Sequence, residues 1–166
     1  MWPEGEFEGH WRAQGEQQGE EHHVYSTADG KTVIKRNNLK YHASFLEYFE
    51  RVALHNHLFP QSRLHFLGFD ESDWMLKPVT SQWFIEARRG ATELEIEEHI
   101  TKLGFSCSDD KGLNWYSRET GIVVEDLHDQ NAVSDEQGRL VVFDPVIYAK
   151  PTERLIRATL RPRGLI

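Results

Sequence analysis

Three polar side chains with the chemistry of a phosphoryl-transfer site lie in the last third of the chain. Asp126 is followed five residues later by Asn131, and the apolar run 140–143 then ends in Asp144. A carboxylate can accept the proton of an attacking hydroxyl, and an Asn with a second carboxylate can hold Mg²⁺ on nucleotide phosphates. The spacing therefore indicates a metal-dependent site that moves a phosphoryl group, although Asp and Asn also favour turns and could serve here only as turn formers.

A β-hairpin is expected to position these side chains. The segment 122–147 alternates short β-prone runs with turn residues, and Gly138 marks the turn before the run that ends in Asp144. A carboxylate that closes an apolar strand is poorly explained by burial alone, because burying it without a partner is costly. We therefore expect all three polar side chains around one hairpin.

Two further hairpins are expected upstream. Short β-prone runs flank the turn residues 28–30, and a second pair of runs flanks the polar residues 70–72. Before the first of these hairpins, residues 7–11 form a weak strand at best. The first half of the chain is therefore expected to be rich in antiparallel strands.

Two helices are indicated by capping-box spacing. Ser44 with Glu47 predicts a helix over about 44–57, which Pro60 ends. Four residues would share one face of this helix: Phe45, Phe49, Val52 and Asn56. Thr92 followed by Glu95 repeats the spacing and predicts a second helix, which ends near residue 103.

The order of these motifs resembles the protein-kinase-like superfamily, and in particular the Ser/Thr/Tyr kinase domain found in polyvalent proteins of phages and other mobile elements. Against the kinase pattern H-R-D-L-x-x-x-N, residues 124–131 read V-E-D-L-H-D-Q-N. The resemblance implies that Asp126 is the catalytic carboxylate and that Asn131 and Asp144 bind the metal. The H-R pair is absent, and Pro and Val follow Asp144 in place of Phe and Gly.

The resemblance extends to the nucleotide-binding positions. The run V-I-K ending at Lys35 is similar to the V-A-I-K strand of kinases, which implies that Lys35 contacts the α- and β-phosphates of ATP. Its helix partner would be Glu50 or Glu47, and we expect Glu50 because Glu47 belongs to the helix cap. Three further positions are candidate nucleotide contacts by the same resemblance: Gly15, Gly19 and His128.

The fold implied by the resemblance is α+β: a minimal protein-kinase-like fold with an antiparallel five-stranded N-lobe sheet, one main helix and a truncated C-lobe. We expect a single kinase-like domain over 1–166, with an N-lobe at about 7–79, a hinge at about 79–82 and a reduced C-lobe at about 83–166. The C-lobe is expected to be short because 22 residues follow Asp144. A partner or a second copy of the chain could complete it.

The implied function is phosphoryl transfer from ATP, with Mg²⁺, to a hydroxyl acceptor on a protein or a small molecule. We therefore favour an ATP-dependent kinase. The alternative is a catalytically inactive pseudokinase that binds a nucleotide or a partner, which the incomplete Gly-rich loop supports. The acceptor and the oligomeric state stay open.

The composition argues against several other classes. With 27 Asp and Glu against 19 Lys and Arg, the net charge is -8, which makes nucleic acid an unlikely partner. A nucleic-acid accessory role rests only on a basic C-terminal cluster: Lys150, Arg154, Arg157, Arg161 and Arg163. The single cysteine, Cys107, excludes an intrachain disulfide, and no apolar run reaches the ~20 residues of a membrane span. We therefore expect a cytoplasmic protein without a membrane partner.

Overall fold

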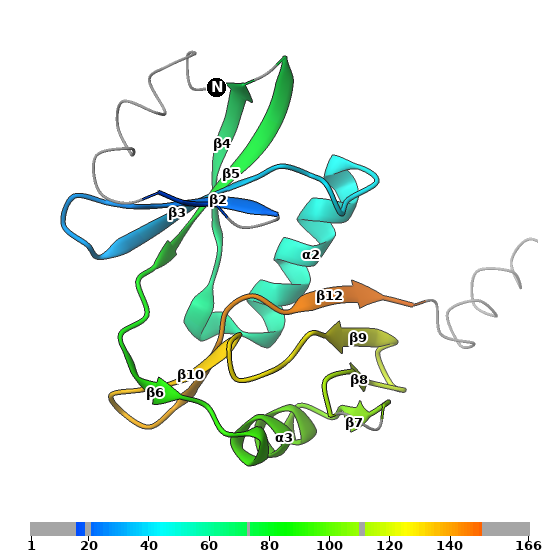
Figure 1. Cartoon of the computed structure of the whole chain (residues 1–166). Coiled ribbons are helices and arrows are strands. Elements are labelled where there is room, and N and C mark those ends of the chain that lie inside the picture. The colour runs from blue at the N-terminus through cyan, green and yellow to red at the C-terminus, as the bar shows by residue number, and fades with distance from the viewer. Residues whose placement is uncertain (1–15, 19–20, 73, 110–111, 151–166) are drawn as a thin grey trace, which may run out of the picture. The chain divides into compact units, whose positions relative to one another are not determined.

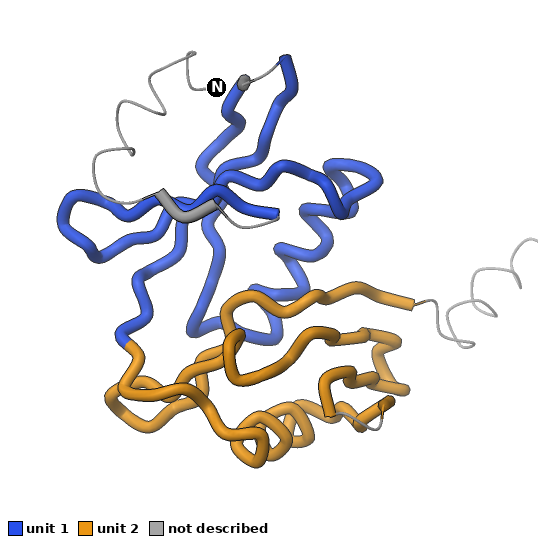
Figure 2. The backbone as a smooth tube through the Cα atoms, in the orientation of Figure 1, with its two compact units in different colours: residues 1–86 blue, residues 87–166 orange. Residues whose placement is uncertain are grey.

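The computed structural model describes residues 16–18, 21–72, 74–109 and 112–150. Residues 1–86 and 87–166 form two compact units, which we call the first and the second unit (Figures 1 and 2). Each unit combines antiparallel strands with an α-helix, so the protein is α+β, as predicted. Among the described residues, no helix has the length and apolar character needed to cross a membrane.

The first unit is built on a five-stranded antiparallel sheet with the order β1-β2-β3-β5-β4, which confirms the predicted sheet (Figure 1). Its strands are β1 (Glu16–Gln18), β2 (His22–Ser26), β3 (Thr32–Asn37), β4 (His65–Ser72) and β5 (Met75–Trp83). In the predicted turn between β2 and β3, the Thr27 N–H donates to the Thr32 carbonyl at 2.9 Å. Gly30 has a φ of +66°, a conformation that glycine adopts without steric cost.

The hairpin of β4 and β5 is present, but its turn is displaced. Residues 70–72 lie in β4 rather than in the turn, because β4 continues to Ser72. The Arg36 guanidinium donates from Nη1 to Asp70 Oδ2 at 2.8 Å, and the two side chains are only 6% and 4% exposed. Asp70 is a turn former by type, but this buried ion pair holds it in the sheet. The predicted turn at 70–72 is therefore wrong.

The expected lobe boundaries stay predictions. Residues 79–82, where we predicted a hinge, lie within β5 and pair with β3. The two compact units divide after Glu86. The start of the predicted N-lobe at residue 7 lies outside the described residues.

Helix α2 (Phe45–Leu58) begins where the capping signal predicts. The Glu47 N–H donates to Ser44 Oγ at 3.2 Å, and the short 3-10 helix η2 (Pro60–Ser62) follows, because proline cannot continue an α-helix. The buried side chains of α2 are Tyr48, His55 and Leu58. The predicted stripe of Phe45, Phe49, Val52 and Asn56 is therefore rotated from the stripe that is buried.

Hydrogen-bond partners explain why polar side chains of α2 are buried. Tyr48 is hydrogen-bonded to Thr80 of β5, and the ring of His55 lies with Nε2 at 3.0 Å from the Ser62 carbonyl oxygen. Four partly exposed rings of α2 and β4 pack edge to face: Phe45, Phe49, Phe66 and Phe69. The helix thus buries its polar contacts and leaves part of its aromatic surface exposed.

The second unit contains two small antiparallel sheets. The three-stranded sheet has the order β11-β10-β6 and consists of β6 (Ala87–Gly90), β10 (Ala132–Asp135) and β11 (Leu140–Val142). The four-stranded sheet has the order β12-β9-β8-β7 and consists of β7 (Ser106–Cys107), β8 (Trp115–Tyr116), β9 (Ile122–Glu125) and β12 (Val146–Ala149). All these strands are short, so loops make up much of the second unit.

Helix α3 (Glu93–Lys102) is the second predicted helix. Its capping box is complete, because Thr92 Oγ1 accepts the Glu95 N–H at 3.3 Å and Glu95 Oε2 accepts the Thr92 N–H at 2.9 Å. Ile96 and Ile100 are its buried side chains. The predicted helix is therefore confirmed, with its apolar face toward the interior of the second unit.

Candidate active site

Two nested strand pairs carry the predicted site residues of the second unit. Strands β10 and β11 form an inner hairpin, and β9 pairs with β12 outside it, in a different sheet. The predicted hairpin with its turn at Gly138 is therefore present as β10 and β11, whereas the pairing of β9 with β12 outside it was not predicted. The outer pair joins Glu125 to Val146, and a local pattern of β-prone runs cannot indicate such a distant partner.

The ends of these strands bring Asp126, Asn131 and Asp144 to neighbouring positions. Strand β9 ends one residue before Asp126, and its partner β12 begins two residues after Asp144. Asn131 precedes β10, and its carbonyl accepts the Phe143 N–H at 3.0 Å, so it lies opposite the residue before Asp144. The three polar residues therefore meet at one end of the nested strand pairs.

Asn131 holds Asp126 in an uncommon backbone conformation. The φ of Asp126 is +59°, in the left-handed region that few residues other than glycine adopt. Asn131 Nδ2 donates to the Asp126 carbonyl oxygen at 2.8 Å and to its carboxylate Oδ2 at 3.1 Å. Asn131 therefore positions both the backbone and the carboxylate of Asp126, and its Oδ1 stays available as an acceptor.

His128 is the second neighbour of this carboxylate. Its Nδ1 accepts the Gln130 N–H at 3.1 Å, so the proton of the neutral ring belongs on Nε2. Nε2 lies 3.3 Å from Asp126 Oδ1 and 3.3 Å from Asn131 Nδ2. The Asp126 side chain is still 56% exposed and open to a ligand. A contact between His128 and phosphate stays a prediction.

Glu125 occupies the position of the arginine in the kinase pattern. The Tyr148 hydroxyl of β12 donates to Glu125 Oε1 at 2.6 Å, and this hydrogen bond raises the pKa of Tyr148. The contact ties β9 to β12 immediately before Asp126. Glu125 thus strengthens the outer strand pair that sets the position of the site.

The oxygen donors at this end of the second unit fit a magnesium ion shared with a nucleotide. Asn131 Oδ1 and the exposed carboxylate of Asp144 are hard ligands, and Mg²⁺ in such sites takes one or two carboxylates together with phosphate oxygens. Among the described residues, no group of three or more His, Cys, Asp or Glu could hold a metal. The donors therefore suit an ion that phosphate oxygens help to bind.

Lys35 lies in the middle of the sheet of the first unit. It is 6% exposed and is paired with Val24 of β2 and Thr80 of β5. Directly paired residues point to the same face of a sheet, so Lys35 shares its face with Thr80, which is hydrogen-bonded to Tyr48. Burial raises the pKa of Tyr48 to about 12. Lys35 therefore lies on the face of the sheet that α2 contacts.

The predicted pair of Lys35 and Glu50 is not formed in this structure. Glu50 is exposed, and within the described part of the chain it has no ion-pair partner. It lies two residues after the buried Tyr48, which is about 200° around a helix. Glu47, the other candidate, contacts Arg51 at 3.2 Å. A pairing of Lys35 with either glutamate stays a prediction for the nucleotide-bound protein.

Some predicted positions lie outside the described residues. Gly15 and Gly19, the candidates for a phosphate-covering loop, precede and follow β1 in the sequence and lie outside the described residues. The basic cluster after Lys150 also lies outside them. These assignments stay predictions.

Tyr48, through which α2 contacts Thr80 beside Lys35, was not among the residues predicted from the sequence. The available signal was helical spacing, because Tyr48 and His55 are seven residues apart and therefore on one face of a helix. The left-handed backbone of Asp126 was not predicted either, and the run of turn formers around it was the only signal for it.

Comparison with known proteins agrees with the resemblance seen in the motifs. The family model described as Serine/Threonine/Tyrosine Kinase found in polyvalent proteins matches residues 3–151. No curated protein matches the sequence. The matched range contains every candidate site residue named above. The chain belongs to the family of Ser/Thr/Tyr kinases found in polyvalent proteins.

Proposed function

We propose that this protein transfers the γ-phosphoryl group of ATP, with Mg²⁺, to a hydroxyl group on a protein or a small molecule. Family membership supports the use of a nucleotide. The observation that carries the proposal is that the backbones of Asp126, Asn131 and Asp144 lie at neighbouring positions at one end of the nested strand pairs. Among the described residues of the second unit, α3 is the one α-helix, and this small helical content supports a reduced C-lobe.

In the proposed reaction, the acceptor oxygen forms a bond to the γ-phosphorus while its proton passes to the Asp126 carboxylate. The bond between the γ-phosphorus and the oxygen bridging to the β-phosphate breaks, and ADP leaves with that electron pair. Asn131 and His128 hold the Asp126 carboxylate in place before the acceptor arrives. Such positioning, with stabilisation of charge, supplies most of the catalysis in phosphoryl transfer.

The nucleotide contacts are divided among the remaining candidates. Asn131 Oδ1 and the Asp144 carboxylate would hold Mg²⁺, which when bound neutralises charge on the phosphate oxygens. Lys35 would contact the α- and β-phosphates, as in other kinases. Gly15 and Gly19 would belong to a loop that covers the phosphates, as the resemblance to kinases implies.

The test compares the wild type with Asp126→Asn at matched nucleotide occupancy. The readouts are transfer from γ-labelled ATP to a library of Ser, Thr and Tyr peptides and, independently of any acceptor, slow ATP hydrolysis. We expect Asp126→Asn to lower turnover at least 100-fold with ATP affinity changed less than 3-fold. Glu119→Gln, in an exposed turn of the second unit, is the control and should leave both quantities unchanged.

The alternative function is that of a pseudokinase that binds a nucleotide or a partner without turnover. The exposed Glu50 and the replacement of the kinase arginine by Glu125 favour it. Equal rates for the wild type and Asp126→Asn, at background both in peptide phosphorylation and in ATP hydrolysis, would reject the kinase proposal and support the pseudokinase.

A further inference from the structure

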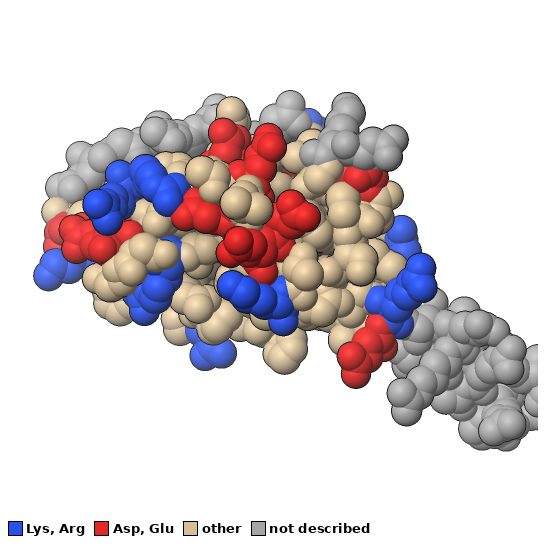
Figure 3. Space-filling view, turned by 90° about the horizontal axis from the view of Figure 1, so that it is seen from below, with Lys and Arg blue, Asp and Glu red and all other residues tan. Residues whose placement is uncertain are grey.

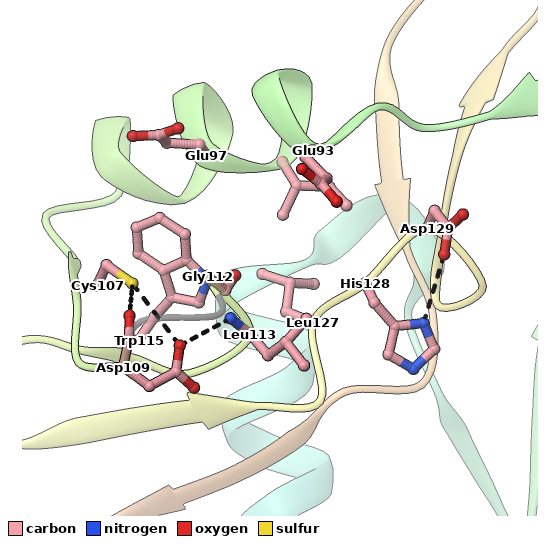
Figure 4. A pocket seen from close by; sticks show the side chains of 11 residues that line it. Glu93, Glu97, Cys107, Asp109, Gly112, Leu113, Trp115, Leu127, His128 and Asp129 are labelled. Carbon is pink, nitrogen blue, oxygen red and sulfur yellow. Dashed lines mark hydrogen bonds and ion pairs between the residues drawn. The ribbon is translucent and has the colours of Figure 1, made fainter.

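The second unit contains a cavity of about 340 Å³ that the proposed reaction does not use (Figure 4). It lies between α3, residues 107–109 and 112–115, and residues 127–129. Its apolar lining includes Ile96, Trp115 and Leu127, each at most 3% exposed. The volume is at the lower end of the range for ligand pockets and is enough for one long side chain.

Carboxylates stand at the exposed part of this cavity. Glu93 and Glu97 of α3 and Asp129 are exposed lining residues, and Asp109 is a half-buried one (Figure 4). Figure 3 views the molecule from the side of α3 and shows Asp and Glu side chains gathered in the middle of that face. The cavity therefore combines a buried apolar lining with negative charge at its opening.

The glutamates of α3 differ in what they contact. Glu95 is paired with Arg89 at 2.6 Å, and Glu98 lies 3.9 Å from Lys102. Glu93 and Glu97, which line the cavity, have no cationic partner among the described residues. The two glutamates without a cationic partner are thus the ones that face the cavity. A cationic ligand would supply the missing partner.

The apolar lining and the carboxylates together select a particular kind of ligand. Lys and Arg carry a charged group on an aliphatic stem, and they bury the stem on apolar surface while the charge stays at a polar opening. An uncharged apolar ligand would leave Glu93 and Glu97 without a cationic partner. The cavity therefore fits an alkyl guanidinium or alkyl ammonium group.

His128 connects the cavity to the candidate active site. It lines the cavity, and its Nε2 lies 3.3 Å from Asp126 Oδ1. We propose that the cavity binds an Arg or Lys side chain of an acceptor polypeptide, a few residues from the hydroxyl that is phosphorylated. The proposal rests on the proposed function, and it makes the phospho-acceptor a basic protein segment.

Binding is tested first, without nucleotide, so that it does not depend on turnover. N-acetyl-arginine amide and its neutral isostere N-acetyl-citrulline amide are titrated into the ¹⁵N-labelled full chain. The reporter is the Trp115 indole N–H, which donates to the Gly112 carbonyl at 3.1 Å beside the cavity and is assigned with Trp115→Phe. We expect a saturable shift with the arginine derivative and at least 10-fold weaker binding of the citrulline derivative.

A pair of variants assigns that binding to the cavity. Glu93→Gln combined with Glu97→Gln should weaken binding of the arginine derivative at least 10-fold. The matched control is Glu98→Gln, on the same helix but outside the cavity, which should bind as the wild type does. Equal binding of the two derivatives, or equal binding by the double variant and the wild type, would overturn the proposal.

Turnover is tested second, with Ser peptides that differ only in arginine or citrulline two or three residues from the serine. We expect kcat/KM to be at least 10-fold higher for the arginine peptide, and the double variant to remove this preference without changing ATP hydrolysis. An arginine peptide that binds no tighter than the isolated derivative would overturn the assignment to a polypeptide. Charge-dependent binding without phosphorylation of any peptide would refute a polypeptide acceptor. If ATP hydrolysis were also at background in the wild type and in Asp126→Asn, the cavity would stand and the proposed function would be refuted.

Discussion

Asp70→Asn tests how far the first unit depends on one buried ion pair. Arg36 Nη1 donates to Asp70 Oδ2 at 2.8 Å, with the two side chains 6% and 4% exposed. The guanidinium also lies 5.9 Å from the ring centre of Tyr25, which is fully buried. Removal of the Asp70 charge leaves the buried Arg36 cation without this counter-charge. Breaking such a pair from one side destabilises a protein by about 3–5 kcal/mol.

This magnitude converts into shifts that are easy to measure. For a chain of this size, about 1 kcal/mol corresponds to about 2–4 °C, so the melting temperature should fall by roughly 6–20 °C. In urea, with a slope of about 2 kcal/mol per molar, the midpoint should fall by roughly 2 M. Circular dichroism in the far ultraviolet follows both transitions. Glu71→Gln, which removes the same charge from the exposed neighbouring residue, should change the unfolding free energy by less than about 0.5 kcal/mol.

A double substitution tests the same ion pair by removing both of its partners. Replacing both partners by apolar residues, Arg36→Met with Asp70→Leu, removes the buried cation together with its acceptor. Such replacements are often neutral, so the double variant should recover most of the stability that Asp70→Asn loses. The reasoning is refuted if Asp70→Asn loses less than about 1 kcal/mol, or if Glu71→Gln loses as much.

Three further predictions concern Glu21, Thr92 and Asp144. Burial raises the pKa of Glu21, but the hydrogen bond from His42, the charge of His22 and the hydrogen bond from Asn37 together outweigh it and lower that pKa to about 2. The contribution of Glu21 to the unfolding free energy, on the order of 2 kcal/mol, should thus be fully present above pH ~4.5 and vanish as the pH falls toward 2. It is measured as the difference in unfolding free energy between the wild type and Glu21→Gln. Thr92→Ala should cost about 1 kcal/mol in thermal unfolding and Thr92→Ser much less, because Thr92 caps α3. Asp144→Ala should abolish the Mg²⁺-dependent part of ATP binding in calorimetry, and equal affinities at saturating Mg²⁺ would reject Asp144 as a metal ligand.

The helices were predictable because the contacts that begin them are local. Ser44 and Thr92 each accept the backbone N–H of the residue three positions ahead. A hydrogen bond of this kind depends on few residues outside the first turn, so residue type and spacing are sufficient evidence. The buried face of α2 was harder to predict, because Tyr48 and His55 are buried through partners that lie far along the chain or beyond the helix.

The strand partners were not predictable because they depend on distant residues. Asp70 looked like a turn residue, and its ion pair with Arg36 spans 34 positions. The pairing of β9 with β12 spans the entire inner hairpin. Residue types and spacing therefore indicated the candidate site residues, whose roles stay predictions, whereas the nested pairing that brings their backbones to neighbouring positions could not be predicted.

The backbone of Asp126 decides which substitution separates chemistry from folding. At a φ of +59°, an alanine would be strained by about 1–2 kcal/mol, so Asp126→Ala would alter stability and chemistry together. Asparagine tolerates this conformation and keeps an oxygen that can accept from Asn131 Nδ2, but its amide cannot take up the proton of a hydroxyl. If Asp126→Asn loses turnover at unchanged unfolding free energy, the loss belongs to the carboxylate as a base. This one substitution therefore distinguishes the kinase hypothesis from the pseudokinase hypothesis.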